Sequence, residues 1–158
     1  MLLSLLQDGC FAAIAAIGFA AISRPPRTAY VHCAFIAAVG HGIRFVLMRN
    51  GVHIIPAALV AALAIGLLAT FLARRAKCPP ETFTFPALLP MIPGMYAYNT
   101  VKGLVMCAVC TDETQFLHYF HLMAANGLVC SLAILAMVGG VTVPILLLKN
   151  VSFSATRA

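Results

Sequence analysis

The chain alternates long apolar stretches with short polar breaks. Five apolar stretches stand out, at residues 5–22, 30–48, 54–73, 83–106 and 119–148. Each is close to or longer than the roughly 20 residues that a helix needs to cross a bilayer. The breaks contain proline, glycine and basic residues, which typically end helices. We therefore predict an all-α integral membrane protein in which residues 1–158 form a single transmembrane domain of about five helices.

The composition excludes the main soluble classes. Hydrophobic residues make up 63% of the chain and charged residues only 9%, whereas a soluble domain carries about 25% charged residues. We therefore expect a protein whose main surroundings are the lipid bilayer, and not a soluble enzyme. The net charge is +6, but no basic run is long enough to follow nucleic-acid phosphates, so we expect no nucleic-acid partner.

The basic residues predict the orientation in the membrane. With five spans, the 1–2 loop, the 3–4 loop and the C-terminal tail lie on one side. That side carries Arg24, Arg27, Arg74, Arg75, Lys77, Lys149 and Arg157. Because Lys and Arg concentrate in cytoplasmic loops, we place the N-terminus outside and the C-terminus in the cytoplasm. An alternative with a re-entrant segment 30–48 distributes these charges almost evenly. The first stretch contains Asp8 and lacks a basic start, so we expect it to be retained as a helix and not removed as a signal peptide.

Five polar side chains lie inside the apolar stretches and need an explanation, since a charge deep in a bilayer costs at least about 2.5–3.5 kcal/mol. At 1.5 Å per residue, Asp8, Arg44, Lys102 and Asn126 fall in the outer half, and His41 falls close to the midplane. They could therefore meet, with Asp8 neutralising Arg44 or sharing a water-filled cavity with it. The alternative is that Arg44 and Lys102 extend to the outer interface as anchors.

The fourth stretch is interrupted by the sequence Leu89-Pro-Met-Ile-Pro-Gly-Met-Tyr-Ala-Tyr98. Proline lacks the helical N–H donor, and glycine tolerates irregular backbone. We predict that this helix is broken at Pro90–Gly94. Broken membrane helices are found where the freed backbone groups are buried in protein or line a wet path, with a simple proline kink as the alternative. Tyr96 and Tyr98 would add hydroxyl groups beside the break.

Two cysteine patterns suggest other chemistry. Cys107 and Cys110 form a Cys-x2-Cys pair, which would suit a membrane thiol oxidoreductase. Adding His118 and His121 gives zinc-type ligands, but the spacing is tight for a chelate. We therefore expect no metal and no cofactor, and keep the oxidoreductase as a lesser alternative.

Small residues recur on two of the predicted helices. Ala12, Ala16 and Ala20 follow each other at four-residue spacing, and residues 54–73 are rich in alanine. Such residues allow helix backbones to approach closely. They predict either packing within this chain or a seam for another membrane subunit.

Two motifs resemble those of a known family. Val39-Gly-His-Gly-Ile-Arg44 and the Pro90–Tyr98 segment, in this order, resemble the threonine/serine exporter (ThrE) family, and in particular the small YjjB-like subunit of its split form. Gln7-Asp8, Gly18-Phe-Ala20 and the region around Asn126 also match. The likeness covers essentially the whole chain, although the cysteine pair is not part of the pattern.

The resemblance implies secondary export of threonine and serine, or of a C4-dicarboxylate such as succinate, together with a larger YjjP-like membrane subunit. The stoichiometry, including any higher hetero-oligomer, is left open. We expect Arg44, with Lys102, to hold a substrate carboxylate, and Asp8 or His41 to couple a proton as in an antiporter. The remaining candidates for the substrate path are Pro90, Pro93, Gly94, Tyr96, Tyr98 and Asn126. The main alternative is a non-transporting accessory subunit that stabilises a larger partner.

Overall fold

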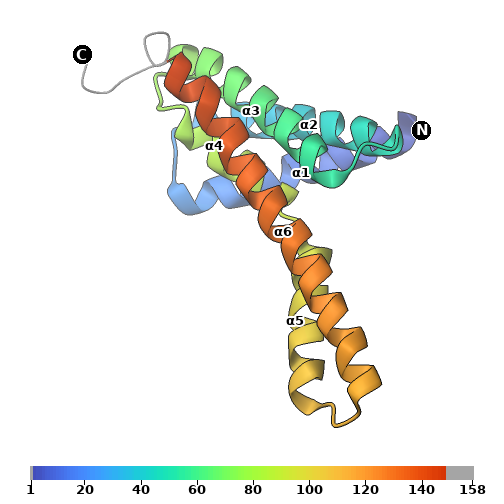
Figure 1. Ribbon diagram of the computed structural model, residues 1–158. Helices are drawn as coiled ribbons and strands as arrows, with labels where there is room; N and C mark the ends of the chain where they lie inside the picture. Colours follow the sequence, from blue (N-terminus) through green and yellow to red (C-terminus); the bar gives the residue numbers. More distant parts are fainter. Residues whose placement is uncertain (1, 149–158) are drawn as a thin grey trace. The chain divides into compact units, whose positions relative to one another are not determined.

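The computed structural model describes residues 2–148, and every regular element in that range is a helix. Lys149 and Arg157, two of the basic residues used for the orientation, lie outside the described residues. The elements in chain order are α1 (Leu2–Ser23), α2 (Arg27–Arg49), α3 (Ile54–Ala76), α4 (Glu81–Leu88), the 3-10 turn η1 (Leu89–Met91), α5 (Gly94–Val109) and α6 (Glu113–Leu147) (Figure 1).

The prediction of an all-α, multi-pass membrane protein is confirmed. Four helices, α1, α2, α3 and α6, are long and apolar enough to cross a membrane. They match the first, second, third and fifth apolar stretches to within a few residues at most ends. The exception is α6, which begins at Glu113, six residues before the predicted stretch, and continues through Pro144.

The fourth stretch is not one helix. α4 ends at Leu88, η1 follows, and α5 begins only at Gly94, so the helix is broken where the prolines predict. Ile92 precedes Pro93, a position at which steric clash disfavours helical backbone. The amide of Gly94 turns back to donate to the Ile92 carbonyl at 2.8 Å. The break is therefore built into the local sequence.

The chain divides into two compact units. The first contains residues up to Met91 together with the chain from Ala136 onward, and the second is Ile92–Leu135. One boundary, between Met91 and Ile92, falls inside the proline break, and the other falls within α6. Each unit is described by itself.

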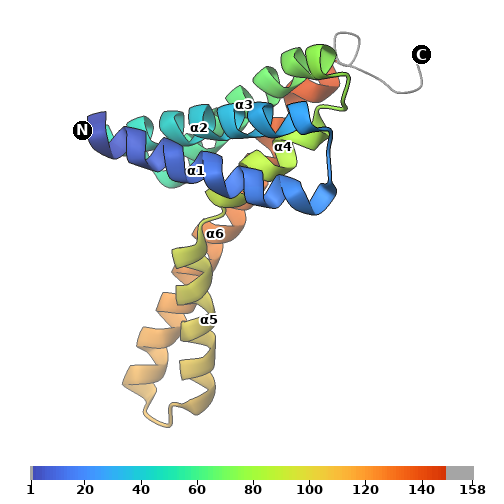
Figure 2. The same cartoon turned by 180° about the vertical axis from the view of Figure 1, so that it is seen from behind.

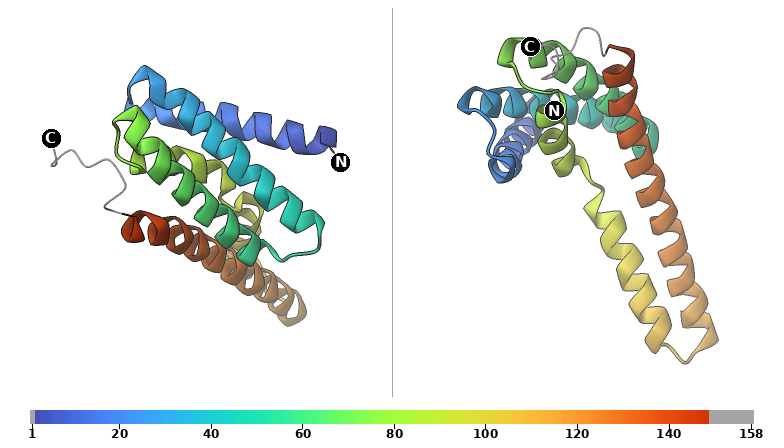
Figure 3. Two further views of the ribbon diagram at one scale, coloured as in Figure 1. Left: turned by 90° about the horizontal axis from the view of Figure 1, so that it is seen from above. Right: turned by 90° about the vertical axis from the view of Figure 1, so that its left-hand side faces the viewer.

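In the first unit, α1, α2 and α3 run antiparallel to their neighbours in sequence (Figures 2 and 3). α2 packs against α1 and α3, and α4 packs against all three. Residues near the α1–α2 loop and near the α3–α4 loop, such as Ala29, Ala73 and Cys78, belong to one buried cluster. These two basic loops lie at the same end of the unit (Figure 2).

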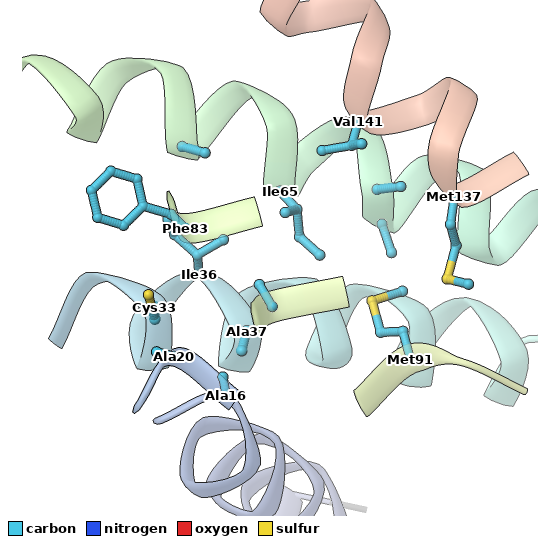
Figure 4. Packing of buried hydrophobic residues seen from close by; sticks show 14 of the residues in the cluster. Ala16, Ala20, Cys33, Ile36, Ala37, Ile65, Phe83, Met91, Met137 and Val141 are labelled. Carbon is cyan, nitrogen blue, oxygen red and sulfur yellow. The ribbon is translucent and has the colours of Figure 1, made fainter. Parts of the chain in front are cut away.

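Alanines form much of the core of this unit. Ala16 and Ala20 of α1 are fully buried, as are Ala61 and Ala69 of α3. Figure 4 shows larger side chains, such as Ile36 and Ile65, filling the space between the helices. Of the two explanations for the alanine stripes, packing within the chain is the one that the structure supports.

Glycines bring α3 and the C-terminal part of α6 into backbone contact. A Cβ atom on Gly140 would lie 2.8 Å from the carbonyl oxygen of Leu59, and one on Gly66 would lie 2.8 Å from that of Val141. Such distances leave no room for a side chain. The two helices are thus joined by a close seam of the kind that small residues permit in membranes.

The second unit pairs α5 with the N-terminal part of α6. A Cβ atom on Gly103 would lie 2.8 Å from both the Tyr119 oxygen and the Met123 nitrogen, so these helices also touch closely. Asp112 caps α6: its carboxylate accepts hydrogen bonds from the Thr114 hydroxyl and, at 3.0 Å, from the Gln115 amide. These bonds lower the pKa of Asp112 below its ordinary value.

Candidate functional site

Arg44 of α2 reaches the break in the fourth stretch. Its guanidinium donates a 2.6 Å hydrogen bond to the carbonyl oxygen of Met91, the last residue of η1. In a continuous helix that oxygen would accept from the amide four residues later, but the chain leaves the helix at Ile92. An unpaired carbonyl costs several kcal/mol in a membrane, so the arginine satisfies a group that the prolines set free.

Asp8 of α1 lies beside His41 of α2. The Nδ1 atom of the imidazole is 3.4 Å from Oδ2 of the carboxylate, and the two side chains are 6% and 37% exposed, respectively. The two atoms lie within the distance of an ion pair, without a well-aligned hydrogen bond, and the imidazole carries a charge only when it is protonated. Among residues 2–148, the ion-pair partner of Asp8 is therefore His41, whereas the sequence suggested Arg44.

His41 is an incompletely satisfied buried group. Both ring nitrogens are buried, and within the described part of the chain neither has a hydrogen-bond partner. Buried polar groups are nearly always paired, because leaving one unpaired costs about 1–3 kcal/mol. The imidazole is thus free to form a hydrogen bond with a group that enters the site.

The glycines beside His41 have different surroundings. A Cβ atom on Gly40 would lie 2.5 Å from the Ile65 side chain of α3, so the space at Gly40 is filled by helix packing. Gly42, by contrast, lines an apolar groove of about 670 Å³ formed by residues of α1 and α2, which also includes Gly9. Asp8, His41 and Arg44 are not among the residues that line this groove.

Three of the predicted residues, Asp8, His41 and Arg44, lie in one region of the structure, and a fourth, Pro90, is next to the Met91 carbonyl there. His41 and Arg44 share a helix face three residues apart, Asp8 contacts His41, and Pro90 precedes the Met91 carbonyl that Arg44 binds. All of these belong to the first unit.

The other predicted residues belong to the second unit. Pro93 precedes α5, and Gly94 begins it. Tyr98 and Lys102 are exposed and Tyr96 is half-buried, while the Asn126 amide donates to the Leu122 carbonyl at 2.7 Å. Their parts in a transport path remain predictions.

Sequence reasoning missed the Met91 carbonyl as the partner of Arg44. A signal was present, because Pro93 pushes the preceding residue out of the helix and so releases the carbonyl groups before it. Sequence alone could not indicate which of those carbonyls would accept the hydrogen bond from Arg44.

The cysteine pair shows no arrangement beyond weak local contacts. Both Cys107 and Cys110 are free thiols. The Cys107 thiol lies 3.8 Å from the Phe116 carbonyl oxygen, and that of Cys110 lies 3.8 Å from the Gln115 side-chain oxygen. Over residues 2–148, no three His, Cys, Asp or Glu side chains come together to hold a metal.

Comparison with known proteins gives the family. The family model described as threonine/serine exporter, ThrE, matches residues 8–147. A Haemophilus influenzae (strain ATCC 51907 / DSM 11121 / KW20 / Rd) protein described as an uncharacterized protein is 40% identical over 104 residues, covering 66% of this chain and 35% of that relative. The chain thus spans about a third of the length of this curated relative. No solved structure matches. The chain belongs to the threonine/serine exporter (ThrE) family, a family of transporters.

Proposed function

We propose that this protein is a five-span subunit of a two-component secondary exporter in the bacterial inner membrane, with its N-terminus outside. Family membership supports export. Four helices are long and apolar enough for four crossings, and the fifth is the crossing that the sequence predicts at residues 83–106. The two basic loops at one end of the first unit support a cytoplasmic position for that end.

The second component is a larger YjjP-like membrane subunit. Support comes from the family resemblance and from the relative in which the matched region is only 35% of the sequence. In that relative, the matched region is part of a single polypeptide that is much longer than the match. A subunit of this kind would supply the remainder of the carrier in the split form.

The observation that carries the substrate assignment is the bond between Arg44 and the Met91 carbonyl. A guanidinium has five N–H donors, and within residues 2–148 only this acceptor is bonded to it. The remaining donors suit a carboxylate, which arginine binds through two parallel hydrogen bonds. Each hydrogen bond to a charged group is worth about 1.5–3 kcal/mol. A substrate carboxylate would therefore bind at Arg44 and compete with a backbone carbonyl of the break.

The Asp8–His41 pair couples transport to protons. An amino-acid substrate such as serine or threonine carries an ammonium group as well as a carboxylate, and Asp8 offers that group a counter-charge. A proton taken up by the pair would remove this counter-charge. Substrate and proton then compete for one site, which is the requirement for an antiporter that exports one while importing the other.

A dicarboxylate such as succinate would use the site differently. It needs a second cation, for which Lys102 is the sequence candidate, and it has no ammonium group for Asp8. Added positive charge at Asp8–His41 would then strengthen binding and not weaken it. The direction of the pH effect on binding therefore distinguishes the two substrate classes, and an acidic side chain at Asp8 suits the ammonium group of the amino acids.

The experiment that tests the function is efflux from proteoliposomes containing this chain and its larger partner. Labelled serine, threonine and succinate are compared with and without a pH gradient. We expect gradient-dependent efflux of serine or threonine. An assembled pair that releases none of the three would contradict export and would instead favour a subunit that only stabilises its partner.

A further inference from the structure

A second groove in the first unit has features that the transport site does not use. It has a volume of about 470 Å³ and is lined by Phe35 of α2 and by residues of α3: Leu68, Phe71, Leu72, Arg74 and Arg75. Phe35 and Phe71 are 54% and 56% exposed. The groove shares no residue with the Asp8, His41, Arg44 and Met91 site. It combines an open apolar wall with two guanidinium groups at one end.

The position of the groove along α3 matches the layers of a bilayer. Arg74 and Arg75 lie in the last turn of α3, which ends at Ala76. Leu68 is six residues earlier, or about 9 Å deeper at 1.5 Å per residue. Half of the hydrocarbon core is about 15 Å thick, so the apolar wall lies at the depth of acyl chains when the arginines lie at the headgroups.

The charge at this end of the unit is strongly positive. Arg24, Arg27 and Lys77 lie in or beside the loops at the same end. The whole chain has four acidic residues, and only Glu81, at the start of α4, lies close to these loops in sequence. No acidic side chain lines the groove. A ligand there must therefore be apolar at one end and anionic at the other.

We propose that this groove binds an anionic phospholipid, with an acyl chain along Phe35, Leu68 and Phe71 and the phosphate on Arg74 and Arg75. Basic pockets between helices on the cytoplasmic side of membranes are suited to such headgroups. The proposal depends on α3 crossing the membrane, and it does not depend on which substrate the carrier exports.

A simpler role for the two arginines is to complement the carbonyl dipoles at the C-terminal end of α3. That role predicts the same loss of stability on their removal whether or not lipid is added. A lipid site instead predicts a loss that appears only when the anionic lipid is present. The two explanations therefore differ in a measurable way.

The test uses the full chain in a neutral detergent, and the thermal unfolding midpoint is followed as lipid is added. Dioleoyl phosphatidylglycerol should raise the midpoint by several degrees, dioleoyl phosphatidylcholine clearly less, and inorganic phosphate not at all. The double variant Arg74→Gln/Arg75→Gln should bind phosphatidylglycerol at least about tenfold more weakly. The matched double variant Arg24→Gln/Arg27→Gln, which loses the same charge outside the groove, should keep the wild-type response.

Two results would overturn the proposal. One is an equal response to phosphatidylcholine and phosphatidylglycerol. The other is an equal loss in both double variants, which would indicate only a diffuse positive surface. If the Arg74/Arg75 double variant does not fold, each single variant should still show a weaker phosphatidylglycerol response than the single variants of Arg24 and Arg27. Equal responses of all four would likewise contradict the site.

Discussion

Arg44 donates a 2.6 Å hydrogen bond to the carbonyl oxygen of Met91, 47 residues away along the chain. This contact joins the two motifs that the family resemblance rests on, the His-Gly-x-Arg segment of α2 and the proline break of the fourth stretch. The break leaves the Met91 carbonyl without a helical partner, and Arg44 supplies the missing hydrogen bond. Because a guanidinium keeps further donors, the same contact leaves a cation available for a carboxylate.

Asp8 and His41 are expected to act as one proton-binding unit. We predict that Asp8→Asn and His41→Gln each make efflux independent of the pH gradient, and that the double variant is no worse than either single variant, because groups acting as a unit give non-additive effects. Efflux is measured with and without the gradient, with His118→Gln, at an exposed histidine of α6, as the control. Single-variant losses that add in the double variant would show that the two residues act separately.

The pH dependence of substrate binding should identify the substrate class. For serine or threonine, we predict that lowering the pH weakens binding, because a proton on the Asp8–His41 pair removes the counter-charge of the ammonium group. For succinate the opposite sign is expected. Equilibrium binding to the assembled carrier at several pH values measures this. Serine binding that strengthens at low pH would contradict competition between substrate and proton.

The close approach of α3 and α6 gives a test of the fold. We predict that Gly140→Ala lowers the free energy of unfolding by about 1–3 kcal/mol, the usual cost of overpacking, because the new Cβ would lie 2.8 Å from the Leu59 carbonyl oxygen. The adjacent Gly139 has nothing within 4 Å of its Cβ position. Gly139→Ala should therefore be neutral or stabilising by up to about 1 kcal/mol. Unfolding of both variants is followed in detergent. Equal effects would contradict the close contact between α3 and α6.

The cap at the start of α6 should respond to acid. Because the folded pKa of Asp112 is lowered below its ordinary value of 3.8, its stabilising effect is present above that value and is lost as the pH falls through the folded pKa. We predict faster amide exchange at Gln115 in Asp112→Ala than in the wild type at pH 5, with the difference shrinking at lower pH. Asp112→Asn, which can still accept the amide bond, should lie between the two.

Much of the fold follows from the sequence. Length and hydropathy predict the long helices, and Pro90, Pro93 and Gly94 predict the break, because these are local effects of covalent geometry. The packing of Ala16 and Ala20 within the chain does not follow, since small residues suit an internal contact and a subunit seam equally well. The division between Met91 and Ile92 depends on tertiary contacts, and composition does not contain that information.

The candidate site was predictable in its residue types but not in its pairings. An arginine, a histidine and an aspartate inside apolar stretches point to one another because each is costly alone in a bilayer. The hydrogen-bond partner of Arg44 is a backbone carbonyl. Every residue has such a carbonyl, so the sequence does not indicate which one accepts the bond. The Asp8 carboxylate, which the sequence suggested as a partner of Arg44, contacts His41 instead.

The most direct test of the central claim is serine efflux by the assembled carrier with three substitutions of α2 arginines. Arg44→Ala should abolish gradient-driven efflux, and Arg44→Gln, which can still donate to the Met91 carbonyl but lacks the charge, should also reduce it at least about tenfold. Arg49→Ala is the control, since that exposed arginine only lies over the Phe45 ring at 5.8 Å. Assembly of each variant with the larger subunit is verified by co-purification. Loss of efflux at Arg44 with retention at Arg49 is the predicted result, and normal efflux by assembled Arg44→Gln would contradict the account.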